Sequence, residues 1–134
     1  MNPNQNLPLY SGISLNNVHL VQTLADAEQA LSTLMSADVL GFDTESKPVF
    51  LKGQQSAGPH LIQLASDTQV FLFPITHATI WMPTVQTVLE SETILKVGFG
   101  LADDKKRLSS RFGITLNNVQ DLSSRLREHK GGDV

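Results

Sequence analysis

The stretch Val39-Leu40-Gly41-Phe42-Asp43-Thr44-Glu45 predicts a β-strand that enters a sheet. Side chains alternate between the two faces of a strand, so Asp43 and Glu45 share a face, with their backbones ~7 Å apart. Two carboxylates on one face repel each other unless a cation lies between them. Such a pair can bridge the ~3.5–4 Å between two metal ions of a phosphoryl-transfer site, where Mg²⁺ or Mn²⁺ prefers oxygen ligands. The alternative is a solvent-facing strand with two ordinary acids.

Short connections join this strand to two more. Residues 61–65 and 70–73 are apolar runs bounded by turn residues, and the segment 46–59 carries Pro, Gly and polar residues that predict a loop. We therefore expect three antiparallel strands. The other expected elements are a strand over 18–21, a helix over 26–35, a helix over 85–89, a strand over 94–99, a helix over 103–112 ended by Gly113, a short strand over 118–122 and the start of a helix over 122–128.

Three strands followed by alternating helices and strands predict a mixed α/β fold. The length of 134 residues suits one domain. The absence of Cys excludes disulfides and cysteine-based metal sites. A net charge of −3 gives no bulk attraction to nucleic acid, and the start of the chain is not typical of a signal peptide. We expect a flexible leader over 1–17 and a cytoplasmic protein that binds no membrane.

A third acid, Asp104, is predicted to face the core. Counting 100° per residue along the helix places Leu101, Leu108 and Phe112 on one buried stripe. Asp104 falls beside this stripe and Asp103 opposite it. A carboxylate at the edge of a core is costly unless it is paired, hydrogen-bonded or bound to a metal. An ordinary first-turn acid that complements the helix dipole is the alternative for Asp104.

Three sequence segments together resemble the DEDD family of 3′–5′ exonucleases, in its ribonuclease D and Werner-exonuclease branch. They are Gly41-Phe42-Asp43-Thr44-Glu45, His60-Leu61-Ile62-Gln63-Leu64-Ala65 and Lys96-Val97-Gly98-Phe99-Gly100-Leu101-Ala102-Asp103-Asp104 with Leu108. The resemblance implies a ribonuclease H-like fold, a mixed sheet with three antiparallel strands followed by alternating helices and strands. It runs from about residue 18, so 18–134 would be a partial exonuclease domain whose C-terminal part is missing.

The resemblance also implies a function. Asp43, Glu45 and Asp104 would be catalytic and would bind two divalent cations, Mg or Mn, of which one activates a water and the other stabilises the leaving 3′ oxygen. Phe42 and Thr44 would contact the substrate, which would be single-stranded or 3′-ended DNA or RNA.

Lysine and arginine near the acids would provide phosphate contacts. A basic rim of Lys47, Lys52, Lys105, Lys106 and Arg107 is expected to bind phosphates. For Lys105, Lys106 and Arg107, an ordinary solvated helix face is the favoured interpretation.

The family's third motif, a Tyr or His followed four residues later by an Asp, has no good match. The single tyrosine is Tyr10, and the pair His129 and Asp133 is separated by two glycines that disfavour a helix. We therefore expect an incomplete site, a weakly held second ion and little nuclease activity. The alternatives are a non-catalytic module of the same fold that binds nucleic acid or protein, and a partly folded product with exposed apolar surface.

Overall fold

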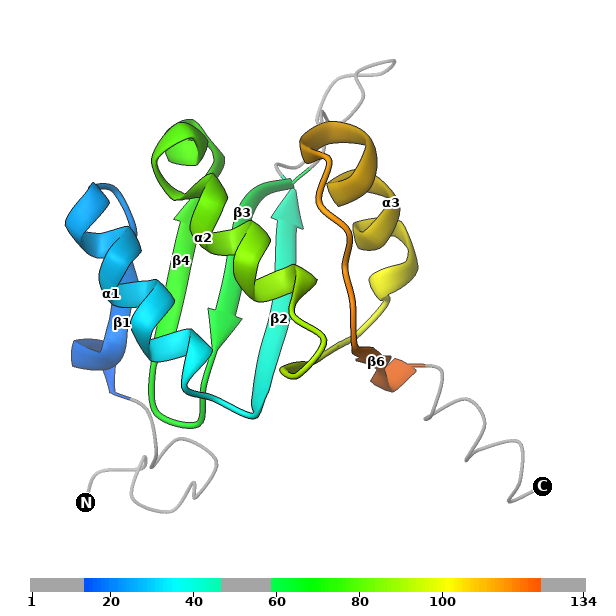
Figure 1. Cartoon of the computed structure of the whole chain (residues 1–134), viewed down its shortest axis with the longest axis horizontal. Helices are drawn as coiled ribbons and strands as arrows, with labels where there is room; N and C mark the ends of the chain where they lie inside the picture. Colours follow the sequence, from blue (N-terminus) through cyan, green and yellow to red (C-terminus); the bar gives the residue numbers. More distant parts are fainter. Residues whose placement is uncertain (1–13, 47–58, 124–134) are drawn as a thin grey trace, which may run out of the picture.

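A computed structural model describes residues 14–46 and 59–123, which form one six-stranded mixed sheet and three α-helices (Figure 1). The elements are, in order, the 3₁₀ helix η3 (Leu15–Asn17), β1 (Val18–Leu20), α1 (Leu24–Met35), β2 (Val39–Ser46), β3 (Pro59–Ala65), β4 (Val70–Pro74), the 3₁₀ helix η4 (Ile75–His77), α2 (Ala78–Glu90), β5 (Leu95–Gly98), α3 (Leu101–Phe112) and β6 (Val119–Asp121). The mixed α/β class predicted from the sequence is confirmed.

The strands lie in the order β1-β4-β3-β2-β5-β6. The trio β2, β3 and β4 is antiparallel, as the short connections predict. β5 pairs parallel with the first half of β2, from Val39 to Gly41, and β6 pairs parallel with β5. β5 ends at Gly98, so it does not pair with β2 beyond Gly41.

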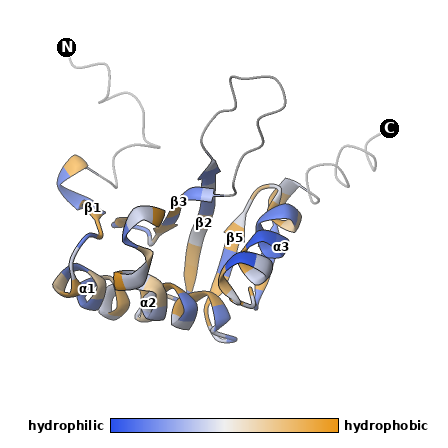
Figure 2. Cartoon of the chain, turned by 90° about the horizontal axis from the view of Figure 1, so that it is seen from above, coloured by the Kyte–Doolittle hydropathy of each residue, from blue (hydrophilic) through white to orange (hydrophobic). Residues whose placement is uncertain are grey.

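The hydrophobic core lies between the sheet and its helices. Figure 2 shows α1 and α2 side by side under one face of the sheet, with α3 beyond them next to β5. Leu40 and Phe42 of β2 point into this core, together with Leu34 of α1 and Trp81 of α2. The Trp81 ring also meets Phe112 of α3 edge-on, at 6.5 Å between ring centroids. The three helices therefore share one core.

The other face of the sheet keeps more solvent contact. Alternation along β2 leaves Val39, Gly41, Asp43 and Glu45 exposed on it. Gln63 of β3 is half-buried, in register with Asp43. The two acids of the opening stretch therefore share a face, as their spacing predicts.

The largest change from the sequence prediction is the length of α2. The sequence predicts a helix over 85–89, whereas α2 begins at Ala78 and runs through Pro83. Proline inside a helix costs about 3 kcal/mol. Burial of Trp81, whose indole nitrogen donates to the carbonyl of Pro74 at 2.7 Å, offsets that cost. The helix α1 likewise begins at Leu24 rather than residue 26, because Thr23 and Asp26 form a capping box.

Several expected features fall on residues outside the described ranges. They are most of the leader over 1–17, most of the loop over 46–59, the helix over 122–128 beyond residue 123, and the pair His129 and Asp133. The described part of the leader, from residue 14, contains η3. None of the described helices is long and apolar enough to cross a membrane.

Candidate metal and nucleic-acid site

Asp43 and Glu45 stand on β2 where its edge is no longer covered by β5. Both side chains are exposed on the open face of the sheet. The backbone N–H of Thr44 donates to Asp43 Oδ1 at 2.9 Å, which fixes that carboxylate close to its own strand. The pairing of β2 with β3 shifts register between Glu45 and Ser46, so β2 is irregular just beyond the second acid.

Asp104 reaches the same segment of β2 from the first turn of α3. Its side chain is 8% exposed, as the helical count predicts, whereas Asp103 is exposed. The hydroxyl of Thr44 donates to Asp104 Oδ1. The residue between the two β2 acids is therefore the one that contacts the α3 acid.

The pKa of the Asp104 carboxyl reflects its burial and its nearness to Asp43. Burial raises the pKa of the Asp104 carboxyl, and the negative charges of Asp43 and Asp103 raise it further. The hydrogen bond from Thr44 and the positive charge of Arg107 act in the opposite direction without cancelling the rise. A bound cation would relieve this unfavourable charge, and carboxylate oxygens are the ligands that hard divalent cations prefer. The three carboxylates therefore suit a divalent cation in their chemistry.

The arrangement is not a closed cage. Over residues 14–46 and 59–123, no three His, Cys, Asp or Glu side chains gather closely enough to hold an ion. Asp43 and Glu45 lie on the open face, while Thr44, which contacts Asp104, alternates with them on the strand.

The two residues predicted to contact substrate have other partners. The Phe42 ring is 3% exposed and belongs to the core, and the Thr44 hydroxyl is engaged by Asp104. The aromatic ring exposed near the acids is that of Phe99, just after β5, which is 59% exposed. The sequence analysis did not single out Phe99, although an aromatic residue between two glycines at the end of a strand was a signal for it.

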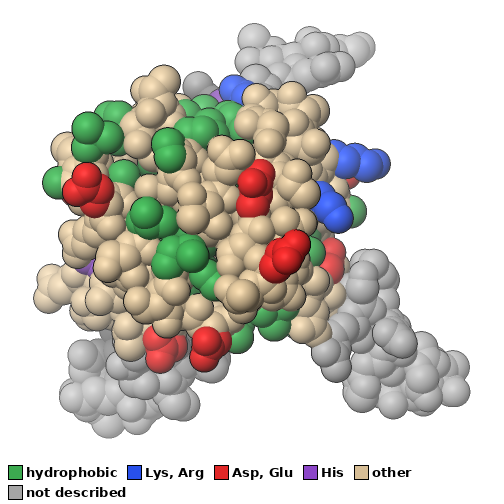
Figure 3. Space-filling view, viewed as in Figure 1, with side chains coloured by type: hydrophobic (Ala, Val, Ile, Leu, Met, Phe, Trp, Pro, Cys, Tyr) green, Lys and Arg blue, Asp and Glu red, His purple; other side chains and the backbone are tan. Residues whose placement is uncertain are grey.

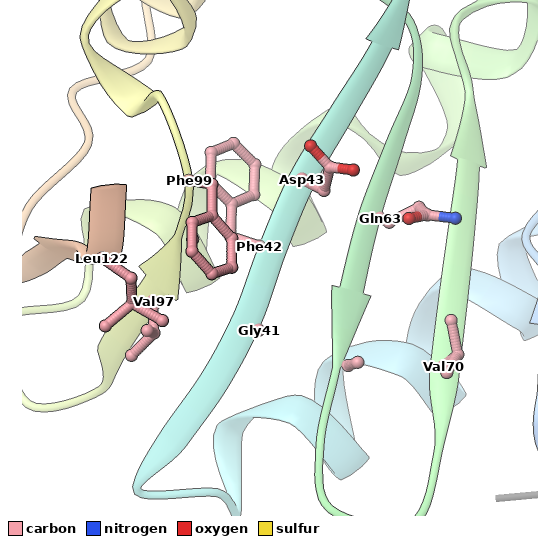
Figure 4. Close-up of a pocket in the computed structure, with 10 residues that line it drawn as sticks. Gly41, Phe42, Asp43, Gln63, Val70, Val97, Phe99 and Leu122 are labelled. Atoms are coloured by element: carbon pink, nitrogen blue, oxygen red, sulfur yellow. The ribbon is translucent and has the colours of Figure 1, made fainter. Parts of the chain in front are cut away.

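A pocket of about 590 Å³ opens beside the acids (Figure 4). Its wall combines Asp43, Gln63 and Phe99 with apolar residues from four strands and with Leu122 after β6. The pocket lies on the open face of the sheet, next to the carboxylate that β2 presents.

Basic side chains gather along α3, at the right of Figure 3. The exposed residues there are Lys105, Lys106, Arg107 and Arg111. They follow Asp104 directly, so positive charge stands next to the acidic site. Lys47 and Lys52, the other expected members of the basic rim, lie outside the described residues.

One acid near this site was missed by the sequence analysis. Asp121, at the end of β6, accepts hydrogen bonds from the first amides of α3. The signal was indirect: α3 follows Gly100, which offers no capping side chain, so a cap had to come from elsewhere.

The six-stranded mixed sheet with its helices is a ribonuclease H-like exonuclease fold, shared by solved exonuclease structures. The Trypanosoma brucei RNase D in complex with RNA U12 is 26% identical, with a TM-score of 0.69, and the match covers 81% of this chain and 38% of that one. The EXD2 exonuclease domain is 27% identical, also with a TM-score of 0.69, over 86% of this chain and 60% of that one. A structure of the EXD2 domain soaked in Mg and GMP matches as well.

The sequence profile of the 3′-5′ exonuclease family matches residues 18–128. This chain belongs to that family, in agreement with its resemblance to the DEDD exonucleases. The family is divalent-metal dependent. Two relatives are the mouse bifunctional 3′-5′ exonuclease/ATP-dependent helicase WRN, 27% identical over 72% of this chain, and an Arabidopsis thaliana 3′-5′ exonuclease, 30% identical over 70%. The match spans only 7% and 33% of their lengths.

Proposed function

We propose that this chain carries a metal-dependent 3′–5′ exonuclease site that hydrolyses the terminal phosphodiester bond of DNA or RNA. Asp43, Glu45 and Asp104 are the metal-binding residues, and Mg²⁺ or Mn²⁺ is the ion. The contact between Thr44 and Asp104 carries the proposal, because it brings an acid from α3 to the strand segment that bears the other two acids.

Thr44 and the basic residues of α3 support the three metal-binding residues in this proposal. The Thr44 backbone orients Asp43 and its hydroxyl holds Asp104, so one residue sets the direction of two ligands. The basic residues of α3 attract the phosphates of the strand. When bound, the cations supply an activated water for attack on the phosphodiester and stabilise the leaving 3′ oxygen.

We further propose that this chain alone holds its second ion weakly and cleaves slowly. The family's third motif, implied by the resemblance, would supply a fourth acid and a Tyr or His. The only tyrosine of the sequence is Tyr10, far from the other motifs. Three carboxylates leave more of the cation charge uncompensated than four.

Metal titration tests the assignment of the ligands. Mn²⁺ or Mg²⁺ is expected to raise the Tm of the chain, because an ion that binds only the folded state stabilises it. Asp43→Ala and Asp104→Asn should abolish this rise, whereas Asp103→Asn, which removes an exposed charge next to Asp104, should keep it. A rise that survives Asp104→Asn would contradict the proposed site.

Cleavage is tested with single-stranded DNA and RNA oligonucleotides labelled at the 5′ end. We expect slow, Mn²⁺-dependent shortening from the 3′ end that disappears in Asp43→Ala. Robust stepwise shortening would contradict the proposal of a weak site. Shortening that Asp43→Ala does not affect would contradict the assignment of the ligands.

The second candidate is a non-catalytic module that binds nucleic acid through α3. It is favoured by the absence of a closed three-residue cage among residues 14–46 and 59–123. This candidate predicts oligonucleotide binding without metal, unchanged in Asp43→Ala and weakened in Lys105→Ala. The exonuclease proposal predicts that binding of the 3′ end depends on Mn²⁺ and on Asp43.

A further inference from the structure

The carboxylate of Asp121 bridges the end of β6 and the start of α3. Its Oδ1 accepts the backbone N–H of Gly100 at 3.0 Å, and its Oδ2 accepts the N–H of Leu101 at 2.9 Å. The backbone N–H and the hydroxyl of Ser123 donate to Oδ1 at 3.0 Å and 2.5 Å. Four hydrogen bonds therefore converge on one half-buried side chain.

This carboxylate replaces the N-cap side chain that α3 lacks. The N-cap residue of α3 is Gly100, in the left-handed conformation with φ of 64°, and it has no side chain to accept an amide. The first amides of a helix need acceptors from outside the helix. Asp121 supplies both oxygens from a different element, twenty residues further along the chain. Its negative charge also complements the positive end of the helix dipole.

The capped turn is the turn that carries Asp104. Leu101 and Asp104 are three positions apart, so they occupy the same first turn of α3. A change in the direction of this turn moves the Asp104 carboxyl relative to Thr44. The tie from Leu101 to Asp121 fixes the turn against β6, which pairs with β5 and through it with β2. The Leu101–Asp121 hydrogen bond and the strand pairing thus connect Asp104 on α3 with Asp43 and Glu45 on β2 through the sheet.

We infer that Asp121 is a positioning residue for the metal ligand Asp104: by capping α3 in place of a side chain at Gly100, it sets where that carboxyl meets β2. This inference rests on the proposed function of the same site. Asp121 does not itself contact the acids. Its hydrogen bonds hold the pKa of its carboxyl down at about 2, mainly through the Ser123 hydroxyl and the Leu101 amide, so the cap is ionised at neutral pH.

The test is the affinity for Mn²⁺, measured by electron paramagnetic resonance of the unbound ion well below the unfolding temperature. Asp121→Ala should weaken Mn²⁺ binding by about tenfold or more, the lower end of losses caused by removing a partner that orients a metal ligand. Asp103→Asn is the control. It also removes one negative charge, next to Asp104, but it leaves the cap intact, so its affinity for Mn²⁺ should stay within about twofold of wild type.

A conservative variant separates positioning from folding. Asp121→Asn keeps one carbonyl acceptor and should bind Mn²⁺ with an affinity between those of wild type and Asp121→Ala. If Asp121→Ala does not fold, the Mn²⁺ affinity of Asp121→Asn tests the inference by itself. A purely structural role would lower the Tm of Asp121→Asn while leaving the Mn²⁺ affinity of the folded protein unchanged, and that result would overturn the inference.

The same experiment distinguishes this inference from the proposed function. If wild type binds no Mn²⁺, or if Asp104→Asn binds it as well as wild type, the proposed metal site fails and the inference fails with it. If binding depends on Asp104 but is the same in wild type, Asp121→Ala and Asp121→Asn, only the inference fails.

Discussion

Gly98 is the residue at which three elements meet. A Cβ at this position would lie 2.4 Å from the carbonyl oxygen of Phe42 and 2.9 Å from Leu101 Cδ2. The first contact is with backbone, which cannot move aside as a side chain can. The close approach of β5 to β2, just before α3 begins, therefore requires glycine here.

We expect Gly98→Ala to lower the free energy of unfolding by at least about 1–3 kcal/mol, the usual cost of forcing extra atoms into a packed site. Gly41→Ala is the matched control, because its Cβ would meet Ala65 at an ordinary 3.9 Å. That change should be neutral or slightly stabilising. Urea unfolding of the three proteins measures both effects, and equal stability of wild type and Gly98→Ala would contradict the packing argument.

Asp104 is predicted to destabilise the metal-free protein. Burial and the neighbouring charge of Asp43 raise the pKa of its carboxyl, so the ionised form is disfavoured in the folded state. Asp104→Asn should therefore raise the metal-free stability at neutral pH, although most substitutions lower stability by about 1 kcal/mol. The amide oxygen can still accept the Thr44 hydroxyl. Chemical denaturation in the presence of a chelator provides the measurement, and a clear loss of stability would contradict the prediction.

At the residue scale, part of the site followed from the sequence. The alternation of a strand placed Asp43 and Glu45 on one face, and helical periodicity placed Asp104 at the edge of the core. The contact of Asp104 with Thr44 could not be predicted, because it depends on β5 ending at Gly98 and exposing the edge of β2 to α3. The same alternation that aligns the acids directs Phe42 into the core.

Among the elements, the turn between α2 and β5 depends on a buried lysine. Lys96 is fully buried, and its ammonium donates to the carbonyl oxygens of Ser91 at 2.6 Å and Ile94 at 2.7 Å. Ser91 is the C-cap of α2. The lysine therefore ties the last turn of the helix to the strand that follows it. Burial lowers its pKa from 10.5 to about 8.

This shift predicts an alkaline rise in stability. Below pH 8 the lysine is charged in both the folded and unfolded states, so its burial costs a constant free energy. Between pH 8 and 10.5 the unfolded state binds more protons, and stability rises with pH, by at most about 3 kcal/mol over that range. Urea unfolding should show this rise for wild type and for Lys105→Met, an exposed lysine, but not for Lys96→Met. The same slope in Lys96→Met would contradict the assignment.

Helix boundaries were predictable where local signals set them. The end of α3 at Phe112 followed from Gly113, which adopts φ of 66°. The start of α2 did not, because Pro83 opposes a helix locally, and the packing of buried Trp81 against Phe112, thirty-one positions later, cannot be seen in a short window.

For the whole molecule, the sheet order predicts where the structure opens first. β3 is hydrogen-bonded on both sides, to β2 and β4, whereas β1 and β6 are three-residue strands at the two edges. Strands with few buried contacts exchange their amide hydrogens through low-energy local openings. Hydrogen–deuterium exchange should therefore be slowest in β3 and fast in β1 and β6. Equal protection of β3 and β6 would contradict this order.

The sheet as a whole was only partly predictable. Short connections revealed the antiparallel trio, but nothing in the sequence indicated that β1 joins the sheet at its far edge, parallel to β4. Such a pairing joins segments about fifty residues apart and depends on packing rather than on local propensity.

The alternation along β2 has a consequence for how this segment can change. Inserting or deleting one residue between Gly41 and Asp43 would turn both carboxylates under the helices and bring the Thr44 hydroxyl out to solvent. Insertion or deletion of a single codon would therefore bury two charges and remove both carboxylates from the proposed metal site. Length variation is therefore not tolerable within this strand.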